Sequence, residues 1–349
     1  MHITWGLRYG GIETMLVDIV NLQCLEHDVE LLIINQDIDK DLLSQVSPHV
    51  KIHKIDRPPK SKNPFYILKL NFILLFSKSD IIHCQMDNIA KYYPLHFLRK
   101  NFCLTVHSVR LGYKDISKYN YIFAISDEVK ESAKKQTGVE AQVVYNGIET
   151  QKFNIEKKNI SDGKFNLVQI GRLDHLNKGH HLTLRAIHNL VTQYNYTDIH
   201  LDIIGEGDSE KYLRELVDKL NINDYVAFFG VRTKDYIRKN LTYYDLLVQP
   251  SLWEGFGLTI IEAMSAMVPT LISNVDGMKT VSLNGIFSYT FQSENVEDYS
   301  EKLYNVIQLS VDEREALAKK AYKYACENFD ISTTVGNYTK HYRKIIQNR

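Results

Sequence analysis

The chain has 349 residues, which is longer than a single hydrophobic core usually grows, so its length predicts two domains. Apolar residues make up 44% and charged residues 24%, a balance that excludes a chain disordered over most of its length. Lysine plus arginine and aspartate plus glutamate number 42 each, so the overall charge gives no reason to expect a nucleic-acid partner.

In the first half, short apolar runs alternate with longer helical patterns, which is typical of βαβ units and parallel sheets. The longer pattern at 12–25 predicts one helix, and another is predicted from Ser126 or Asp127, as cap, to Gly138. The runs that we interpret as strands lie at residues 2–5, 29–34, 50–55, 79–85, 102–108, 121–126 and 141–147. The first half is therefore expected to form one doubly wound domain.

A polar stretch at 154–164 interrupts the pattern and is interpreted as the connection between two domains. The pattern then restarts, with strands expected at 165–173, 199–207, 225–230, 244–250, 268–273 and 287–291. The final helical pattern, from Asp312 to about Ile346, is expected to break near 328–333. We expect an α/β protein with one Rossmann-like domain over 1–155 and a second over 156–334. A last helix, about 335–349, is expected to cross back to the first domain.

The four cysteines show no paired spacing of the kind that binds zinc, so we expect reduced thiols and no zinc site. They are Cys24, Cys84, Cys103 and Cys326. The opening "MHITWGLRYGG" has no basic region followed by a long apolar stretch, so no signal peptide is expected. These features predict a cytoplasmic protein.

In doubly wound sheets, ligands bind beyond the carboxyl ends of the strands, so the loops there are the first places to inspect. Gly10 and Gly11 follow the first strand and would let an anion approach the helix N-terminus, although a tight turn explains them equally well. Arg172 and Lys178 follow the strand at 165–170. They could hold a diphosphate between them, although cations in exposed loops are usually solvated.

Two acids, Glu254 and Glu262, flank a glycine-containing apolar run. If the loop 253–257 leads into a helix, Glu262 lies about one turn inside it, and the first backbone N–H groups point at an anion. A carboxylate there can accept hydrogen bonds from sugar hydroxyls. The alternative, with Glu254 as a cap and Glu262 as a surface charge, accounts for either acid alone but not for both acids with the glycines.

Glu254 and Glu262 are separated by seven residues, and Gly-Phe-Gly follows Glu254. This pattern resembles the signature of retaining glycosyltransferases of family 4, also called glycosyl transferases group 1. That family has the GT-B fold, in which two Rossmann-like domains face each other across a cleft. The resemblance covers nearly the whole chain. Further segments match in order: Gly10-Gly11 with Glu13, and residues 144–150, 171–179, 203–208 and 268–278.

The resemblance implies a role for each matched residue. Arg172 and Lys178 would hold the donor diphosphate and stabilise the charge on the leaving nucleotide. Glu254 would face the transferred sugar, and His107 stands where the family keeps a histidine near that sugar. Glu262 would bind the ribose hydroxyls. The remaining donor-binding positions are Gly10, Gly11, Gly205, Gly207, Val231, Gly255, Phe256, Gly257, Leu258 and Thr259.

Two of these assignments stay open at the level of sequence. A histidine such as His107 after a strand is more often a hydrogen-bonded structural residue when it is judged without the family. Lys279, Thr280 and Val281 stand where many relatives have an acidic residue, which leaves the donor-sugar contacts of that loop open.

The resemblance implies a metal-independent hexosyltransferase-like enzyme without cofactors, which moves a sugar from a UDP or GDP type donor and keeps its anomeric configuration. The acceptor would be a saccharide or a lipid-linked saccharide, and the resemblance leads us to expect a role in cell-surface polysaccharide biosynthesis. A nucleotide-sugar epimerase of GT-B fold and a non-catalytic nucleotide-sugar-binding protein are the alternatives. The base, sugar, linkage and oligomeric state are not predicted.

The apolar segment 65–76 allows two interpretations. Lys69 and Asn71 interrupt it, and it falls well short of the roughly 20 residues that a membrane-spanning helix needs. With Lys60, Lys62 and Lys69 nearby, it could make a peripheral contact with anionic lipid at the inner face of the cell membrane. A core helix of the first domain is the favoured interpretation.

Overall fold

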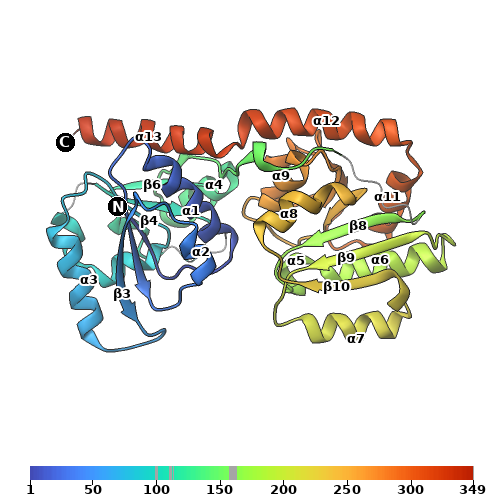
Figure 1. The fold of residues 1–349 in the computed structure, drawn as a ribbon, viewed down its shortest axis with the longest axis horizontal. Coiled ribbons are helices and arrows are strands. Elements are labelled where there is room, and N and C mark those ends of the chain that lie inside the picture. Colours follow the sequence, from blue (N-terminus) through green and yellow to red (C-terminus); the bar gives the residue numbers. More distant parts are fainter. Residues whose placement is uncertain (99–100, 110–111, 113, 157–162, 349) are drawn as a thin grey trace. The chain divides into compact units, whose positions relative to one another are not determined.

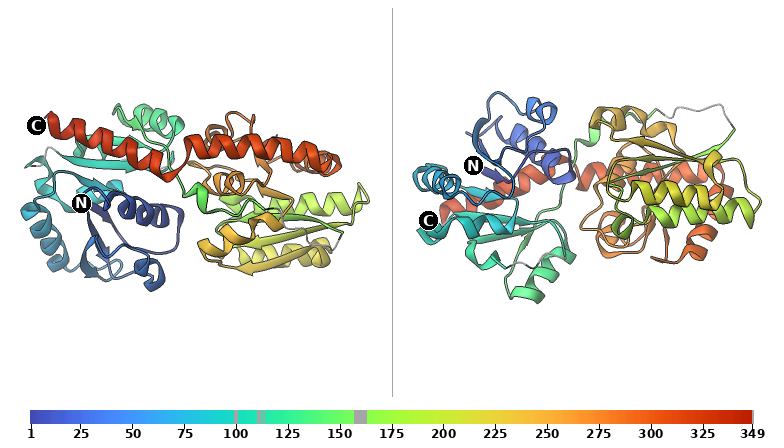
Figure 2. Two further views of the ribbon diagram at one scale, coloured as in Figure 1. Left: turned by 45° about the horizontal axis from the view of Figure 1, so that its top comes forward. Right: turned by 90° about the horizontal axis from the view of Figure 1, so that it is seen from below.

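The computed structural model describes residues 1–98, 101–109, 112, 114–156 and 163–348. The chain divides into two compact α/β units (Figure 1). Unit 1 comprises Met1–Ile148 and Asp330–Arg349, and unit 2 comprises Glu149–Phe329. The boundaries therefore lie a few residues before the expected ones at 155 and 334. Helices lie on both faces of the sheet in each unit (Figure 2).

Unit 1 is built on a seven-stranded parallel sheet with the order β3-β2-β1-β4-β5-β6-β7. The strands are β1 (His2–Thr4), β2 (Glu30–Asn35), β3 (Lys51–Arg57), β4 (Ile82–Cys84), β5 (Phe102–Val106), β6 (Tyr121–Ala124) and β7 (Gln142–Val143). The order reverses between β1 and β4. Such a switch point opens a crevice at the carboxyl ends of the strands, where doubly wound sheets bind ligands.

The helices of unit 1 are α1 (Gly11–Gln23), α2 (Lys40–Ser44), α3 (Pro64–Phe76), α4 (Asp127–Thr137) and α13 (Ile331–Gln347), with 3-10 helices η1 (Asp87–Tyr92), η2 (Pro94–Leu98) and η3 (Ile116–Lys118). The predicted ends of α4 are confirmed. The Ser126 side chain accepts a hydrogen bond from the N–H of Val129, and Gly138 closes the helix with φ 73°. Both are the termini that helix capping favours.

The final helical pattern breaks as predicted, and its last part belongs to unit 1. Helix α12 (Val311–Asn328) ends in unit 2, and α13 begins after Asp330, whose side chain accepts a hydrogen bond from the N–H of Ser332. Helix α13 lies beside α1, as the two views of Figure 2 agree. The prediction that a C-terminal helix joins the first domain is therefore confirmed.

A buried hydrogen-bond network fixes α13 to the sheet of unit 1. The Nδ1 atom of His83 lies 2.5 Å from the hydroxyl of Tyr342, and its Nε2 atom lies 2.7 Å from the hydroxyl of Thr105. The hydroxyl of Tyr338 lies 2.9 Å from that of Thr105. Burial lowers the pKa of His83 well below its ordinary value, so the neutral ring offers one donor and one acceptor.

Unit 2 is built on a six-stranded parallel sheet with the order β10-β9-β8-β11-β12-β13. The strands are β8 (Phe165–Ile170), β9 (Ile199–Ile204), β10 (Val226–Gly230), β11 (Leu246–Gln249), β12 (Thr270–Ser273) and β13 (Tyr289–Phe291). Leu167, Leu201 and Val248 are fully buried, as expected for the apolar runs of a sheet covered on both faces. The switch point of this sheet lies between β8 and β11.

The helices of unit 2 include two that frame its switch point. Short helix α5 (His175–Lys178) follows β8, and α9 (Leu258–Ser265) follows β11. The others are α6 (His180–Thr192), α7 (Glu210–Leu220), α8 (Lys234–Asn240), α10 (Asp276–Ser282), α11 (Val296–Gln308) and α12, with 3-10 helices η4 (Thr150–Lys152), η5 (Asn223–Tyr225) and η6 (Leu241–Tyr243).

Candidate functional site

The segments that follow β8 and β11 carry the four charged residues that the sequence singled out in the second half. Arg172 and Lys178 follow β8, while Glu254 and Glu262 follow β11. Strands β8 and β11 are parallel neighbours, paired through Leu167 and Leu246 among others. Their carboxyl ends therefore lie at one edge of the sheet, and the switch point brings the two loops together.

Lys178 and Glu254 form a direct ion pair across these loops. The Lys178 ammonium donates to the Glu254 carboxylate over 2.5 Å, and the two side chains are 26% and 16% exposed. The Ser251 hydroxyl also donates to this carboxylate, over 3.4 Å. Glu254 is thus not the cap of α9, whose N-cap residue is Gly257. An ammonium has three N–H donors, so the bond to Glu254 leaves it capacity to bind a ligand.

The backbone around Lys178 is held by close packing and by a buried amide. Gly179 has φ 65°, and a Cβ added there would lie 1.9 Å from the carbonyl oxygen of Pro250. Only glycine permits this approach between the β8 loop and the β11 loop. The Gln169 side chain donates to the carbonyl oxygen of Lys178 over 3.0 Å. Lys178 is therefore positioned by both strands of the switch point.

A chain of polar side chains connects Arg172, after β8, to Trp253, after β11. Its guanidinium pairs with Asp174 at 3.2 Å and is 70% exposed. Asp174 also accepts a hydrogen bond from the side chain of Asn177, which accepts one from the indole N–H of Trp253. Sequence reasoning missed Asp174 and Asn177. Their only signal was their place between Arg172 and Lys178 in a loop that follows a strand.

A second relay that the sequence did not reveal lies beneath Glu254. The Gln249 amide donates to the Ser251 hydroxyl over 2.8 Å, and the Thr259 hydroxyl donates to Gln249 over 3.3 Å. The Ser273 hydroxyl donates to the carbonyl oxygen of Ser251 over 2.5 Å. These bonds connect the carboxyl ends of β11 and β12 to the start of α9, so the Glu254 carboxylate rests on a fixed polar support.

The start of α9 matches the predicted arrangement. Gly257 caps the helix in a left-handed conformation with φ 93°, and half-buried Glu262 lies just over one turn inside the helix. Predicted donor contacts at Gly255, Leu258 and Thr259 would use backbone groups at this end. The side chain of Phe256 is 2% exposed and packs edge-on against Phe329, so only its backbone is available to a ligand.

Gly205 and Gly207 pack the loop after β9 against the loop after β8. At Gly205, with φ 143°, an added Cβ would lie 2.0 Å from the carbonyl oxygen of Gly171. At Gly207 it would lie 2.6 Å from the carbonyl oxygen of Leu173. The structure thus gives both glycines a packing role. Contact of these residues with a nucleotide stays a prediction.

Val231 lies at the same sheet edge but further from Lys178. It follows β10, which is separated from β8 by β9, and its side chain is 47% exposed. Next to it, the Arg232 guanidinium stacks 5.5 Å from the ring centroid of Phe229 and 5.4 Å from that of Tyr236. The Arg232 side chain also donates to the carbonyl oxygen of Val231 over 3.0 Å. The predicted base contact at Val231 is untested.

The predicted residues of unit 1 lie at the carboxyl edge of its own sheet. Gly10 is the N-cap of α1, and a Cβ added there would lie 2.8 Å from the Glu13 carboxylate. Gly11 is the first residue of α1. The Thr14 hydroxyl donates to the carbonyl oxygen of Gly10 over 2.8 Å. Residues 5–10 separate β1 from α1, so the two glycines mark the start of the helix and not a tight turn directly after the strand. Their contact with a phosphate stays a prediction.

His107 lines a cavity of about 180 Å³ at this edge, together with Gln85, Asp87 and Ile12. Its Nε2 atom lies 3.0 Å from the Gln85 side-chain oxygen, and its Nδ1 atom is enclosed and finds no partner among the described residues. Burial lowers the pKa of His107 to about 4, so the ring is neutral at pH 7. The ring can therefore exchange hydrogen bonds with a neutral hydroxyl.

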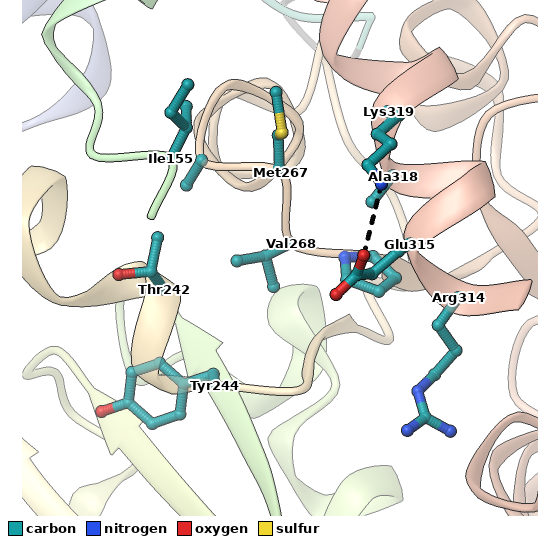
Figure 3. A pocket seen from close by; sticks show the side chains of 11 residues that line it. Ile155, Thr242, Tyr244, Met267, Val268, Arg314, Glu315, Ala318 and Lys319 are labelled. Carbon is teal, nitrogen blue, oxygen red and sulfur yellow. Dashed lines mark hydrogen bonds and ion pairs between the residues drawn. The ribbon is translucent and has the colours of Figure 1, made fainter. Parts of the chain in front are cut away.

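A larger cavity, of about 250 Å³, lies elsewhere in unit 2 (Figure 3). Tyr244 and Val268, which line it, precede β11 and β12, so this cavity is at the amino ends of the strands, opposite Lys178 and Glu254. The side chains of Met267 and Ala318 make its wall largely apolar, and its rim carries an ion pair between Glu315 and Lys319. The switch-point residues do not line it.

Over the part of the chain that the structure describes, no group of three or more His, Cys, Asp or Glu side chains could hold a metal ion. All four cysteines are free thiols. Metal independence of the reaction stays a prediction.

Comparisons with known proteins find similarity to glycosyltransferases. The family described as glycosyl transferases group 1 matches residues 150–324. An uncharacterized glycosyltransferase of Methanocaldococcus jannaschii, MJ1607, is 28% identical over 260 residues, which are 64% of this chain and 66% of that protein. The chain thus spans about two thirds of this relative's length.

Two further similarities extend over more of each chain. An N-acetylgalactosamine-N,N'-diacetylbacillosaminyl-diphospho-undecaprenol 4-alpha-N-acetylgalactosaminyltransferase of Campylobacter jejuni is 24% identical over 295 residues, 75% of this chain and 76% of that protein. The crystal structure of Anabaena Alr3699/HepE in complex with UDP and glucose superposes with a TM-score of 0.83 at 18% identity, covering 97% of this chain and 98% of the other. The superposition shows that the chain has the GT-B fold.

Proposed function

Because the chain belongs to the glycosyl transferases group 1 family, we propose that it transfers a sugar from a nucleotide diphosphate donor to a saccharide or lipid-linked saccharide acceptor. The observation that carries the proposal is the ion pair of Lys178 and Glu254 at the switch point of unit 2. A cation and a carboxylate at the end of two central strands suit a donor that has a diphosphate at one end and sugar hydroxyls at the other.

Lys178 and Arg172 would act on the leaving group. Cleavage of the glycosidic bond leaves negative charge on the nucleotide diphosphate, and fixed cations lower the energy of that state more than that of the bound donor. Lys178 supplies a point charge, whereas Arg172 supplies a planar fork that can bind two phosphate oxygens. The N–H groups at the start of α9 add the positive end of a helix dipole.

The two glutamates would bind hydroxyls. Glu254 stands beside Lys178, so it suits a hydroxyl of the transferred sugar next to the phosphate. Glu262, on α9, suits the ribose of the nucleotide. A carboxylate accepts hydrogen bonds from two hydroxyls at once, which a neutral amide does less strongly. Glu254→Gln is therefore expected to weaken sugar binding while preserving shape.

The donor and acceptor classes are part of the proposal. The Anabaena structure, by its title, holds UDP and glucose, which favours a UDP-sugar over a GDP-sugar here. The Campylobacter relative, by its name, acts on a diphospho-undecaprenol-linked sugar, which supports a lipid-linked acceptor and a role in cell-surface polysaccharide synthesis. Retention of configuration, by attack on the same face as the departing diphosphate, and independence of metals complete the proposal.

Donor turnover in four alanine variants tests the proposal. Lys178→Ala and Glu254→Ala should lower the kcat for UDP-sugar turnover by about 10²–10³, as loss of a transition-state contact does. Lys319→Ala and Glu315→Ala remove a similar ion pair of unit 2, on α12, and should leave kcat unchanged. Equal turnover in all four variants would defeat the assignment. Formation of a sugar isomer from donor alone would favour the epimerase alternative.

A further inference from the structure

Unit 1 has an exposed apolar surface that the proposed chemistry of sugar transfer does not use. We name it the α3–η2 surface, after the two helices that carry its residues. Of sixteen exposed large hydrophobic side chains among the described residues, seven lie between residues 65 and 98. They are Phe65, Leu68, Phe72, Leu75 and Phe76 on α3, and Phe97 and Leu98 on η2. So dense a cluster marks an interaction site rather than the scattered exposure of ordinary surfaces.

The exposed face of α3 is a fixed feature of the fold. Asn63 caps the helix by accepting from the N–H of Phe65, and Leu70 and Leu74 are fully buried. The Lys69 ammonium donates to the carbonyl oxygen of Lys54 on β3, over 2.9 Å. The favoured interpretation of this segment as a core helix therefore holds for the face that carries Leu70 and Leu74. It is wrong for the face that carries the exposed phenylalanines.

The rings on that face are large and close to each other. Phe65, Phe72 and Phe76 are each more than 60% exposed, and the ring centroids of Phe72 and Phe76 lie 4.7 Å apart. The Asn71 side chain donates to the carbonyl oxygen of Tyr92, which connects α3 to the segment just before η2. The two helices therefore belong to one part of unit 1.

The charge around this surface is positive. The whole chain has 42 basic and 42 acidic residues, but residues 60–98, all of them described, include five lysines and two acids, Asp80 and Asp87. Exposed Lys62 stands two residues before the start of α3, and exposed Lys78 two residues after its end. Basic residues flanking exposed phenylalanines are the composition of an interfacial membrane anchor.

We propose that the α3–η2 surface docks on an anionic lipid bilayer. Helix α3 would lie in the plane of the interface, with Phe65, Phe72 and Phe76 at the boundary of the acyl chains and with lysines among the headgroup phosphates. None of the helices in the described ranges is long and apolar enough to cross a membrane, so the contact is peripheral. A protein partner fits less well, because lysine is depleted at protein interfaces.

Flotation of the full chain with vesicles tests the apolar half of the proposal. The protein should float with vesicles of phosphatidylcholine and phosphatidylglycerol, and much less with phosphatidylcholine alone. Phe72→Ser with Phe76→Ser should lower the partition coefficient about tenfold or more, because both rings leave the acyl boundary. Leu25→Ser, at a 75% exposed residue outside the surface, is the matched control and should bind like the parent.

A charge-reversal pair tests the electrostatic half. Lys62→Glu with Lys78→Glu should weaken binding to the anionic vesicles by roughly fivefold or more per lysine, and added salt should reduce the difference. Lys134→Glu with Lys135→Glu makes the same change of charge on α4 and should have a small effect. Circular dichroism should be the same for all variants.

The outcomes separate this inference from the proposed function. Turnover of a soluble UDP-sugar should be unchanged in every surface variant, so a loss of vesicle binding with intact turnover supports docking. A parent protein that ignores anionic vesicles, or serine variants that bind as well as the parent, would overturn the proposal. It would equally be overturned by a dimer, seen in sedimentation, that the serine variants dissociate without any vesicle binding.

Discussion

The two sheets reverse their strand order after the third strand of each sheet, yet different side chains stand at the two switch points. In unit 2 the edge between β8 and β11 holds the charged pair Lys178 and Glu254. In unit 1 the comparable edge holds Gly10, Gly11, Asp87 and His107, and a lowered pKa of about 4 keeps the His107 ring neutral at pH 7. The shared topology places both sites, and the side chains alone decide what each can bind.

The difference suits the two ends of the proposed reaction. A charged edge is the place for a diphosphate, because an anion needs fixed cations and helix N–H groups. An enclosed cavity with a neutral imidazole ring suits hydroxyls, which exchange hydrogen bonds with His107 and Gln85.

The largest effect is expected at Gly179, where the loops of unit 2 meet. Gly179→Ala places a Cβ 1.9 Å from the carbonyl oxygen of Pro250 and at φ 65°, so the free energy of unfolding should fall by about 3 kcal/mol or more. Urea unfolding followed by tryptophan fluorescence would measure it.

Gly336→Ala is the matched change in unit 1. This glycine lies inside α13, and its added Cβ would meet nothing within 4 Å. Alanine should therefore raise the free energy of unfolding by about 0.5–1 kcal/mol. Similar destabilisation by both alanines would show that the close contact of the unit 2 loops is not the cause.

His107 should make the stability of unit 1 depend on pH. Its folded pKa, about 4, is below the ordinary value of 6.5, so its contribution is complete above pH 6.5 and is lost as the pH falls toward 4. Between pH 7 and pH 5 this amounts to about 2 kcal/mol. Denaturant titrations of His107→Gln should show a shallower fall over that range, and parallel curves would contradict the burial of the neutral ring.

Tyr342→Phe should loosen α13 from the sheet of unit 1. The change leaves the Nδ1 atom of buried His83 without its hydroxyl partner, at a cost of about 1–3 kcal/mol. Hydrogen exchange of the α13 amides should become faster, while exchange in α9 stays the same. Unchanged protection of α13 would mean that apolar packing alone holds the helix.

A small effect on catalysis is expected at Ser251, which supports Glu254 without being proposed to touch the donor. Ser251→Ala should lower kcat by about three- to tenfold, because a carboxylate that loses an orienting bond holds its geometry less well. Ser251→Thr, which keeps a hydroxyl, should recover part of the loss. Equal kcat for serine and alanine would remove the relay from the account.

The sequence predicted the fold well because its information is local. The strands of both sheets are apolar runs, and the ends of α4 carry a serine cap and a glycine that any sequence reader can see. The break between α12 and α13 was also visible, at residues 328–333. The charged candidates of unit 2 were found through their loops, and the structure joins two of them directly, across 76 positions of sequence.

The features that the sequence did not reveal depend on tertiary neighbours. The pairing of Asn177 with Trp253, and that of His83 with Tyr342, join residues far apart in the chain, and each residue alone resembles an ordinary polar side chain. Helix α3 is apolar on all sides, so its periodicity could not show which face packs on β3 and which is exposed. Only the neighbours of a side chain decide its burial.

The most direct test of the charged edge is the affinity for UDP, measured by calorimetric titration. Lys178→Ala should raise the Kd about 30-fold or more, since a charge-assisted contact to phosphate contributes about 2 kcal/mol or more. His107→Gln and Lys319→Ala should leave it unchanged. A Kd that is the same in Lys178→Ala as in the parent protein would contradict a diphosphate site at the switch point of unit 2.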